Sequence, residues 1–289
     1  MTFFKLVPFL KLLRPNQWFK NVFVMGPLFF SLNFLNIEML KNSLVAVLCF
    51  IAASSLTYIF NDLHDVEEDR HHPIKKNRPI ASQLIPVKSC IIIGTFILLA
   101  LYTALITQLN EYCVIVITTY LIIQVFYTLK FKYIIILDCI IIASGFVLRV
   151  ILGGYAINVS VSTWIIITTF FLSLFLAFGK RYHEYQFTNY IKIRYPLNQY
   201  RKDFLIYLIS ITCTCSIVMY GLFLVETSHN NNNQNLIYTL VFVIFGLFRY
   251  LQFLFINKQG GEPEIIFYKD MPFLLNTISW VILTLWILY

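Results

Sequence analysis

The feature that most constrains this chain is a series of long, continuous apolar runs that recur from end to end. A helix that crosses a bilayer needs roughly 20 apolar residues, and about nine runs of this kind are present, joined by short polar connections. The runs lack the alternation of apolar and polar residues that marks the strands of a membrane β-barrel. We therefore expect an all-α polytopic membrane protein that forms a single domain over residues 1–289. The expected spans are 19–36, 42–61, 89–107, 112–129, 133–152, 162–179, 204–225, 236–256 and 271–289.

Composition excludes a soluble globular domain. The chain is 59% apolar and only 12% charged, and its mean hydropathy is +0.75, whereas soluble domains are about one quarter charged. The net charge of +8 does not indicate nucleic acid, because the basic residues flank the apolar runs. Anionic lipid head groups and anionic substrates are the simpler partners.

The distribution of Lys and Arg predicts an orientation. Of the 22 basic residues, 19 lie in the N-terminal segment and in alternate connections, while the opposite connections hold only Lys41. The crowded face is therefore expected to be cytoplasmic, with the N-terminus inside and the C-terminus outside. The basic, amphipathic start of the chain has no small-residue cleavage site after a short apolar core, so we expect a retained interfacial segment and not a signal peptide.

Charge is concentrated in the stretch YIFNDLHDVEEDRHHPIKKNRPIAS, residues 58–82. On a helix, Asp62, Asp65 and Asp69 share one face, with Asn61 one turn before Asp65. Three carboxylates so close together repel unless a cation lies among them, and hard oxygen ligands favour Mg²⁺, which also bridges to substrate phosphates. The alternative is a solvated helix end, in which these carboxylates pair with Arg70 and the lysines that follow.

Other ionisable residues complement this acidic face. Several basic residues end predicted spans on the same side of the membrane, namely Lys20, Arg78, Lys132, Lys180 and Arg181. Each alone is also typical of lipid anchoring or topology. Asp138 and Arg149 lie inside one predicted span, where an ionisable group is costly and indicates function. Their separation of 11 residues places them on one helical face. The alternative is a structural ion pair between helices.

The motif NDLHDVEED at 61–69 resembles the N-D-x-x-D-x-x-x-D signature of the UbiA superfamily of intramembrane prenyltransferases. The chain is more similar still to one branch, the decaprenyl-phosphate phosphoribosyltransferases. The blocks that carry this resemblance are LRPNQWFKN at 13–21, NDLHDVEEDRHHPIKKNRPIAS at 61–82, YTLKFKYIIILD at 127–138, SGFVLRVILGG at 144–154, LAFGKRYHE at 176–184 and GEPEIIFYKD at 261–270. One departure is Gln83, where the family usually has glycine, and it puts the conformation of this loop in question.

The resemblance implies about nine transmembrane helices around a cytoplasm-facing cavity. It implies a Mg²⁺-dependent transfer of a phosphoribosyl group from phosphoribosyl diphosphate to a polyprenyl phosphate in a bacterial inner membrane, for cell-envelope polysaccharide assembly. The implied metal ligands are Asn61, Asp62, Asp65 and Asp69. The implied catalytic residues are Asp62, Asp65, Tyr127, Lys132 and Asp138, with Tyr127 and Asp138 on the ribose hydroxyls. The implied substrate-binding residues are Lys20, Asn61, Arg78, Arg149, Lys180 and Arg181.

Two other functions remain open from the sequence. Prenyl transfer to an aromatic acceptor would require a second Asp-rich motif near the fifth and sixth spans, where only Asp138 is present. A transporter with a cytoplasmic metal site would distribute intramembrane charge along a pathway, whereas the charge here collects on one face. A homo-oligomer is possible for either enzyme.

Overall fold

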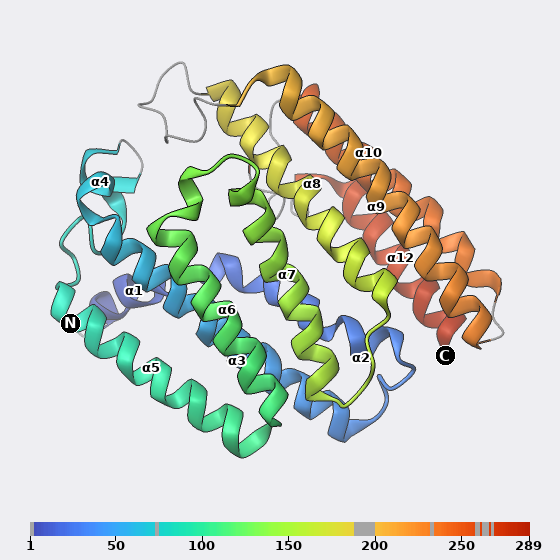
Figure 1. The fold of residues 1–289 in the computed structure, drawn as a ribbon, viewed down its shortest axis with the longest axis horizontal. Helices are drawn as coiled ribbons and strands as arrows, with labels where there is room; N and C mark the ends of the chain where they lie inside the picture. Colours follow the sequence, from blue (N-terminus) through green and yellow to red (C-terminus); the bar gives the residue numbers. More distant parts are fainter. Residues whose placement is uncertain are drawn as a thin grey trace. The chain divides into compact units, whose positions relative to one another are not determined.

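The computed structural model of this chain describes residues 3–72, 75–187, 200–231, 234–257, 261, 266 and 269–289. Regular structure in these ranges is entirely helical (Figure 1). The chain divides into two compact units. Unit 1 comprises residues 1–134 and 148–160, and unit 2 comprises residues 135–147 and 161–289. The sequence analysis expected one domain over the whole chain. Whether the two units form one domain stays a prediction.

Eight helices are long and apolar enough to cross a membrane, within the residues that the structure describes. This confirms a multi-pass membrane protein and eight of the predicted spans. They are α3 (Ile37–His64), α5 (Val87–Gln108), α6 (Glu111–Leu129), α7 (Leu137–Ala156), α8 (Thr163–Phe187), α9 (Lys202–Asn231), η6 (Gln234–Thr239) continued by α10 (Leu240–Phe255), and α12 (Met271–Leu288).

The predicted first span is different, because residues 19–36 do not form one α-helix. The chain instead forms a 3₁₀ helix, η1 (Pro15–Met25), followed by the short α2 (Gly26–Phe30). Gly26 N–H bonds the carbonyl of Phe23, three residues back, and Pro27 has no N–H to continue an α-helical pattern. A 3₁₀ helix repeats every three residues, and its burial follows that period.

The segment η1–α2 nevertheless has the reach of a membrane span. At the rises of 3₁₀ and α-helices its 16 residues extend about 30 Å, close to the thickness of the hydrocarbon core. It lies along α3. This segment is therefore long enough to be the first expected crossing, but its helical geometry differs from the expected α-helix.

Each unit has its own apolar core. In unit 1, α3, α5, α6 and the second half of α7 bury a cluster that includes Phe50, Ile117 and Leu152. Gly153 permits a close approach here, since a Cβ at this position would collide with the backbone carbonyl of Val24. In unit 2, the first half of α7 packs with α8, α9 and α10 around a second cluster.

Short elements gather at the C-terminal end of α3. They are α1 (Phe3–Leu12), α4 (Val66–His71), η2 (Lys75–Asn77) and η3 (Phe131–Tyr133). The chain between α1 and η1 meets this end through Arg14 and Asp62, and η3 meets it through Lys132 and Asp65. Residues far apart in the sequence thus converge on the acidic motif.

Candidate functional site

The acidic motif crosses a break between two helices without losing its common face. Helix α3 ends at His64, Asp65 is the junction, and α4 follows. Asp65 N–H bonds Asn61 O at 2.9 Å and Asp69 N–H bonds Asp65 O at 2.8 Å, so the helical spacing continues through the junction. Asp62, Asp65 and Asp69 are only 3%, 8% and 2% exposed. Asn61 is half-buried.

Three basic side chains neutralise the three buried carboxylates. Arg14 donates to Asp62. Arg78 Nη1 bridges two carboxylates, at 3.1 Å from Asp62 Oδ1 and 2.6 Å from Asp69 Oδ2. Asp65 is held by Lys132, which is itself buried, and by His64 Nδ1 at 2.9 Å.

This cluster is costly to build. Taking several ions out of water is expensive, and buried ion pairs are seldom more stable than apolar residues of the same volume. Burial opposes ionisation of Asp65, but the hydrogen bonds and positive charge of His64 and Lys132 outweigh it, and the pKa of this carboxyl falls below its ordinary value. Burying three carboxylates at an apolar helix end, each with a basic partner, is costly and indicates a functional site.

The sequence interpretation placed a metal ion among these carboxylates, whereas here Arg14, Arg78 and Lys132 balance their charge. Among the described residues, no three His, Cys, Asp or Glu side chains converge as metal ligands. Carboxylate oxygens are nevertheless the ligands that Mg²⁺ prefers, and Asp62 and Asp69 lie close enough to share one partner, Arg78 Nη1. The alternative of a solvated helix end is wrong for all three aspartates.

Glu67 and Glu68 lie outside the cluster. Both are exposed, and Glu67 Oε1 pairs with Arg70 Nη1 at 2.7 Å. The solvated interpretation therefore holds for these two residues. They carry the same charge as the buried aspartates and stand between them in the sequence.

Arg14 is a cluster residue that the sequence did not single out. It appeared there only among the basic residues that set topology. Its backbone is left-handed, with φ of 51°, and its guanidinium also lies 4.6 Å from the ring centroid of Tyr58. Arg14 and Asp62 are 48 residues apart, and the motif spacing contains no signal for that contact. His64 was likewise missed as a partner of Asp65.

The other predicted residues of unit 1 have separate positions. Lys20 is half-buried in η1, and Tyr127 is half-buried in the last turn of α6. Arg149 is buried in α7, where its Nε donates to Asn21 Oδ1 at 2.9 Å. The Arg149 guanidinium lies over the rings of Phe50 and Tyr120.

Asp138 and Arg149 do not form a pair. Both are in α7, as expected, but Asp138 belongs to unit 2. The Asp138 carboxylate is fully buried, and accepts from Arg181 Nε at 2.7 Å and from Tyr200 Oη at 3.0 Å. An ion pair between helices is therefore present, with Arg181 of α8 as the partner. Arg181 Nη1 also contacts Glu184 at 2.5 Å, and Lys180 is exposed on α8.

Tyr200 is a second residue that the sequence did not indicate. Its hydroxyl accepts a hydrogen bond from Ile136 N–H at 2.7 Å while it donates to Asp138. Ile136 has φ of 68°, which is rare for a β-branched residue and costs about 1–3 kcal/mol. Tyr200 thus holds a strained turn at the start of α7. Of the block 261–270, the structure describes only Gly261, Ile266, Lys269 and Asp270.

Fold and site together define a multi-pass membrane protein with buried, charge-balanced carboxylates at the end of a span. The model of the UbiA prenyltransferase family matches residues 23–277, and the chain belongs to this family of membrane transferases. Figure 1 shows its helical architecture. A UbiA homologue from Archaeoglobus fulgidus, solved with DMAPP and Mg²⁺, has the same fold. Its TM-score is 0.70 at 18% identity, covering 97% of this chain and 98% of that one.

Two relatives narrow the comparison. The decaprenyl-phosphate phosphoribosyltransferase of Mycolicibacterium smegmatis is 31% identical, over 94% of this chain and 89% of the relative. The protein of the same name from Corynebacterium glutamicum is 30% identical, over 94% of this chain and 84% of the relative. Similarity to this branch therefore extends over nearly the whole chain.

Proposed function

We propose that this protein transfers the 5-phosphoribosyl group of phosphoribosyl diphosphate to a polyprenyl phosphate. The products are polyprenyl-phosphoryl ribose 5-phosphate and diphosphate. The proposal is supported chiefly by the buried carboxylates balanced by Arg14, Arg78 and Lys132. The two phosphoribosyltransferase relatives also support it. We place the reaction at the cytoplasmic face of a bacterial inner membrane, because the basic residues gather there.

Asp62, Asp65 and Asp69, with Asn61, would hold Mg²⁺. The ion, when bound with the donor, supplies positive charge to the diphosphate that leaves. The three carboxylates match the three cations in charge. A dication bound among the carboxylates would therefore free the guanidinium and ammonium groups that now pair with them. These groups could then donate hydrogen bonds to phosphate oxygens. Arg78 and Lys132 then bind the donor diphosphate.

The reaction requires no general base. An oxygen of the acceptor phosphate forms a bond to the anomeric carbon while the bond from that carbon to the diphosphate breaks, with inversion. A phosphate anion is already nucleophilic, so no proton needs to be removed. We assign Tyr127 to the ribose hydroxyls, and Lys20 and Arg149 to phosphate binding in unit 1.

For unit 2 we propose an indirect role for Asp138. Arg181 and Tyr200 engage its carboxylate oxygens, so Asp138 orients Arg181 and is not placed on the ribose. We assign Arg181 and the exposed Lys180 next to it to the binding of substrate phosphate groups. The resemblance implied a catalytic role for Asp138 on the ribose hydroxyls. We propose that Asp138 instead takes part in the reaction by positioning Arg181.

The test is a transfer assay with purified protein in detergent, labelled phosphoribosyl diphosphate, polyprenyl phosphate and Mg²⁺. Label should enter the lipid phase, and EDTA should stop it. A parallel reaction supplies a labelled prenyl diphosphate with an aromatic acceptor. Transfer from the prenyl donor alone would retain the family and overturn the proposed donor.

A matched pair of variants tests the site. Asp62→Asn should lower turnover by about 100-fold or more, the scale of losing one preorganised charged group in an active site. Glu68→Gln removes the same charge from an exposed position of the same motif, and should leave turnover unchanged. Equal effects of the two substitutions would contradict the assignment of the buried cluster.

A further inference from the structure

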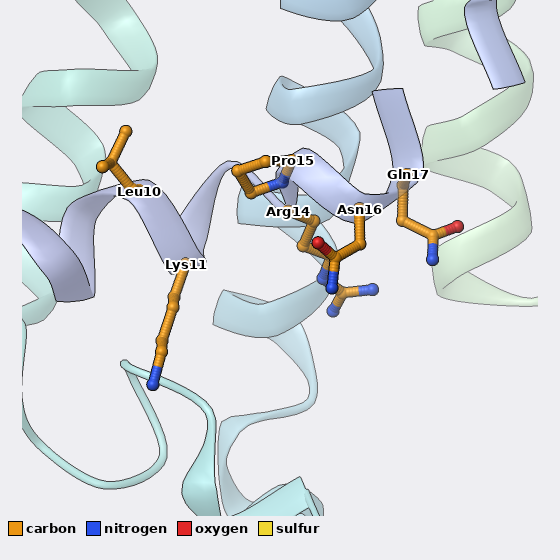
Figure 2. Close-up of a pocket in the computed structure, with 6 residues that line it drawn as sticks. All are labelled: Leu10, Lys11, Arg14, Pro15, Asn16 and Gln17. Atoms are coloured by element: carbon orange, nitrogen blue, oxygen red, sulfur yellow. The ribbon is translucent and has the colours of Figure 1, made fainter. Parts of the chain in front are cut away.

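The corner between α1 and η1 forms an open pocket of about 440 Å³ in unit 1 (Figure 2). Its lining residues are Leu10, Lys11, Arg14, Pro15, Asn16 and Gln17. In Figure 2 the polar ends of Lys11, Arg14, Asn16 and Gln17 extend to one side of the backbone, while Leu10 extends to the other. The pocket therefore has a polar, basic side and an apolar one.

The corner that forms the pocket is fixed in place. The carbonyl of Leu13 accepts two side-chain hydrogen bonds, from Trp18 Nε1 at 3.1 Å and from Ser55 Oγ at 3.2 Å. Ser55 belongs to α3, so the corner is attached to the helix that carries the acidic motif. Arg14 then reaches Asp62. One arginine thus lines the pocket and touches the acidic cluster.

The charge of the pocket suits an anion. Lys11 supplies an exposed positive charge, Arg14 supplies a second that it shares with Asp62, Asn16 and Gln17 supply amide donors, and none of the six lining residues is acidic. The first turn of η1 also lies here, and helix N-termini favour negative charge. Lys11 is exposed, so its ammonium is accessible to a ligand. A phosphate group combines the charge and the acceptor oxygens that these donors require.

An apolar face leads away from the pocket. Every third residue of a 3₁₀ helix lies on the same face. After Pro15 at its first position, the exposed residues of η1 are Asn16, Phe19 and Val22, three residues apart. Phe19 is 50% exposed and Val22 is 48% exposed. The face therefore begins with an amide at the pocket and continues with apolar side chains along a segment long enough to cross the membrane. This order matches a lipid with a phosphate head and a hydrocarbon tail.

We propose that this pocket binds the phosphate of the polyprenyl phosphate acceptor, and that the Phe19 and Val22 face contacts its first isoprene units. The inference deepens the proposed function and rests on it for the identity of the lipid. Arg14 then lies between the acceptor phosphate and the carboxylates assigned to the donor's metal. The acceptor oxygen and the donor diphosphate are thereby held at the same end of α3.

The test is direct binding of labelled polyprenyl phosphate to the purified full chain in detergent, without donor. Lys11→Gln should weaken binding about tenfold, as expected for the loss of one charge-assisted contact. Phe19→Ser should also weaken the binding of polyprenyl phosphate. Its effect should be smaller on a polyprenyl phosphate with a short tail. Lys88→Gln removes a charge from an exposed lysine at the start of α5, and should bind as the unmodified protein does.

Competition separates the sources of phosphate. Unlabelled polyprenyl phosphate should displace the label, while phosphatidylglycerol and inorganic phosphate should do so only at far higher concentrations. Equal displacement by phosphatidylglycerol would overturn the acceptor assignment in favour of a general anionic-lipid contact. Unchanged binding in Lys11→Gln would overturn the pocket itself.

The outcome is separable from that of the proposed function. If transfer occurs but Lys11→Gln leaves both acceptor binding and acceptor KM unchanged, the function stands and the pocket assignment fails. If no phosphoribosyl transfer is found, yet the protein binds polyprenyl phosphate and Lys11→Gln loses it, the pocket stands and the donor assignment fails.

Discussion

Gln83 has a backbone conformation that glycine adopts more readily. Its φ is 61°, in the left-handed region, where a residue with a Cβ is strained by about 1–2 kcal/mol. The sequence resemblance implied glycine at this position, and a left-handed backbone is a physical reason for it. The loop keeps its turn, since Gln83 N–H bonds Ile80 O at 3.0 Å. Glutamine at this position therefore carries a strain that glycine would avoid, and the loop forms its turn with glutamine in place.

Gln83→Gly should accordingly stabilise the protein. The relief of strain is partly offset by the greater freedom of glycine in the unfolded chain, about 0.4–1 kcal/mol, so the net gain should be about 0.5–1 kcal/mol. Leu84→Gly, at the exposed next residue, should lose stability. Denaturant unfolding in detergent measures both. A loss in Gln83→Gly would show that the glutamine side chain makes a contact worth more than the strain.

Gly153 is required by a close backbone contact. A Cβ at this position would overlap the carbonyl of Val24, and a backbone atom cannot rotate away. Gly153→Ala should therefore destabilise unit 1 by about 1–3 kcal/mol, the cost of overpacking. Gly94→Ala is the matched control, because its Cβ would meet Leu56 and Ile59 only at ordinary contact distances of 3.9 and 4.0 Å. Alanine there should be neutral or stabilising by up to about 1 kcal/mol. Equal thermal stability of the two variants would contradict the η1–α7 contact.

At the level of residues, the sequence predicted what local spacing determines. Asp62, Asp65 and Asp69 were found because helical periodicity alone brings them to one face. Arg14 and Tyr200 were not found, since they reach Asp62 and Asp138 over 48 and 62 residues. Only tertiary packing makes those contacts.

At the level of elements, the start of α7 depends on a residue that precedes another helix. Ile136 is strained, and its N–H is satisfied by the hydroxyl of Tyr200, which precedes α9. Tyr200→Phe removes that hydroxyl and leaves a polar N–H and the Asp138 carboxylate each short of a partner. Stability should fall by about 1–3 kcal/mol, measured by thermal unfolding. Tyr207→Phe, on the exposed side of α9, should cost little. If both variants unfold alike, Tyr200 does not hold this turn.

The start of α12 is held by a pH-sensitive contact. Arg249 Nε and Nη2 donate to the two oxygens of Asp270 at 2.9 and 2.8 Å, and Asp270 also accepts from Phe273 N–H as the N-cap of the helix. The hydrogen bond from Arg249 and the N–H of Phe273 together hold the pKa of Asp270 below its ordinary value, against the smaller effect of burial. A depressed pKa in the folded state stabilises the fold above the unfolded value of about 3.9, and this contribution disappears as the pH falls through the lower folded value.

Asp270→Asn should therefore flatten the loss of stability in acid. Unfolding midpoints between about pH 6 and pH 3 should fall less steeply in this variant than in the unmodified protein. Asp203→Asn, an exposed aspartate in the first turn of α9, is the matched control and should retain the original slope. An identical slope in Asp270→Asn would mean that other carboxylates carry the acid sensitivity.

The element that sequence analysis described least well is η1. Apolar length was read there as an α-helical span, whereas the structure buries Asn21 and Val24 of η1 three residues apart, the period of a 3₁₀ helix. The eight other spans were predicted because length and hydropathy suffice for a regular membrane helix. Helical geometry within a span depends on prolines and on backbone approaches such as that of Gly153, and hydropathy does not report those.

For the whole molecule, the geometry of η1–α2 determines the topology. If this segment crosses the bilayer, Lys11 lies on the same side as Ser82, and Leu35 lies on the opposite side. Cysteines at these exposed positions can be labelled in intact cells with a membrane-impermeant maleimide. Five of the six native cysteines are buried and Cys215 lies within α9, so background labelling should be low.

We expect Leu35→Cys to react from outside, and Lys11→Cys and Ser82→Cys to react only after the cells are opened, as the positive-inside tendency requires. If Lys11→Cys and Leu35→Cys react from the same side, η1–α2 enters and leaves the membrane on one face, and the chain makes eight crossings with both ends on one side.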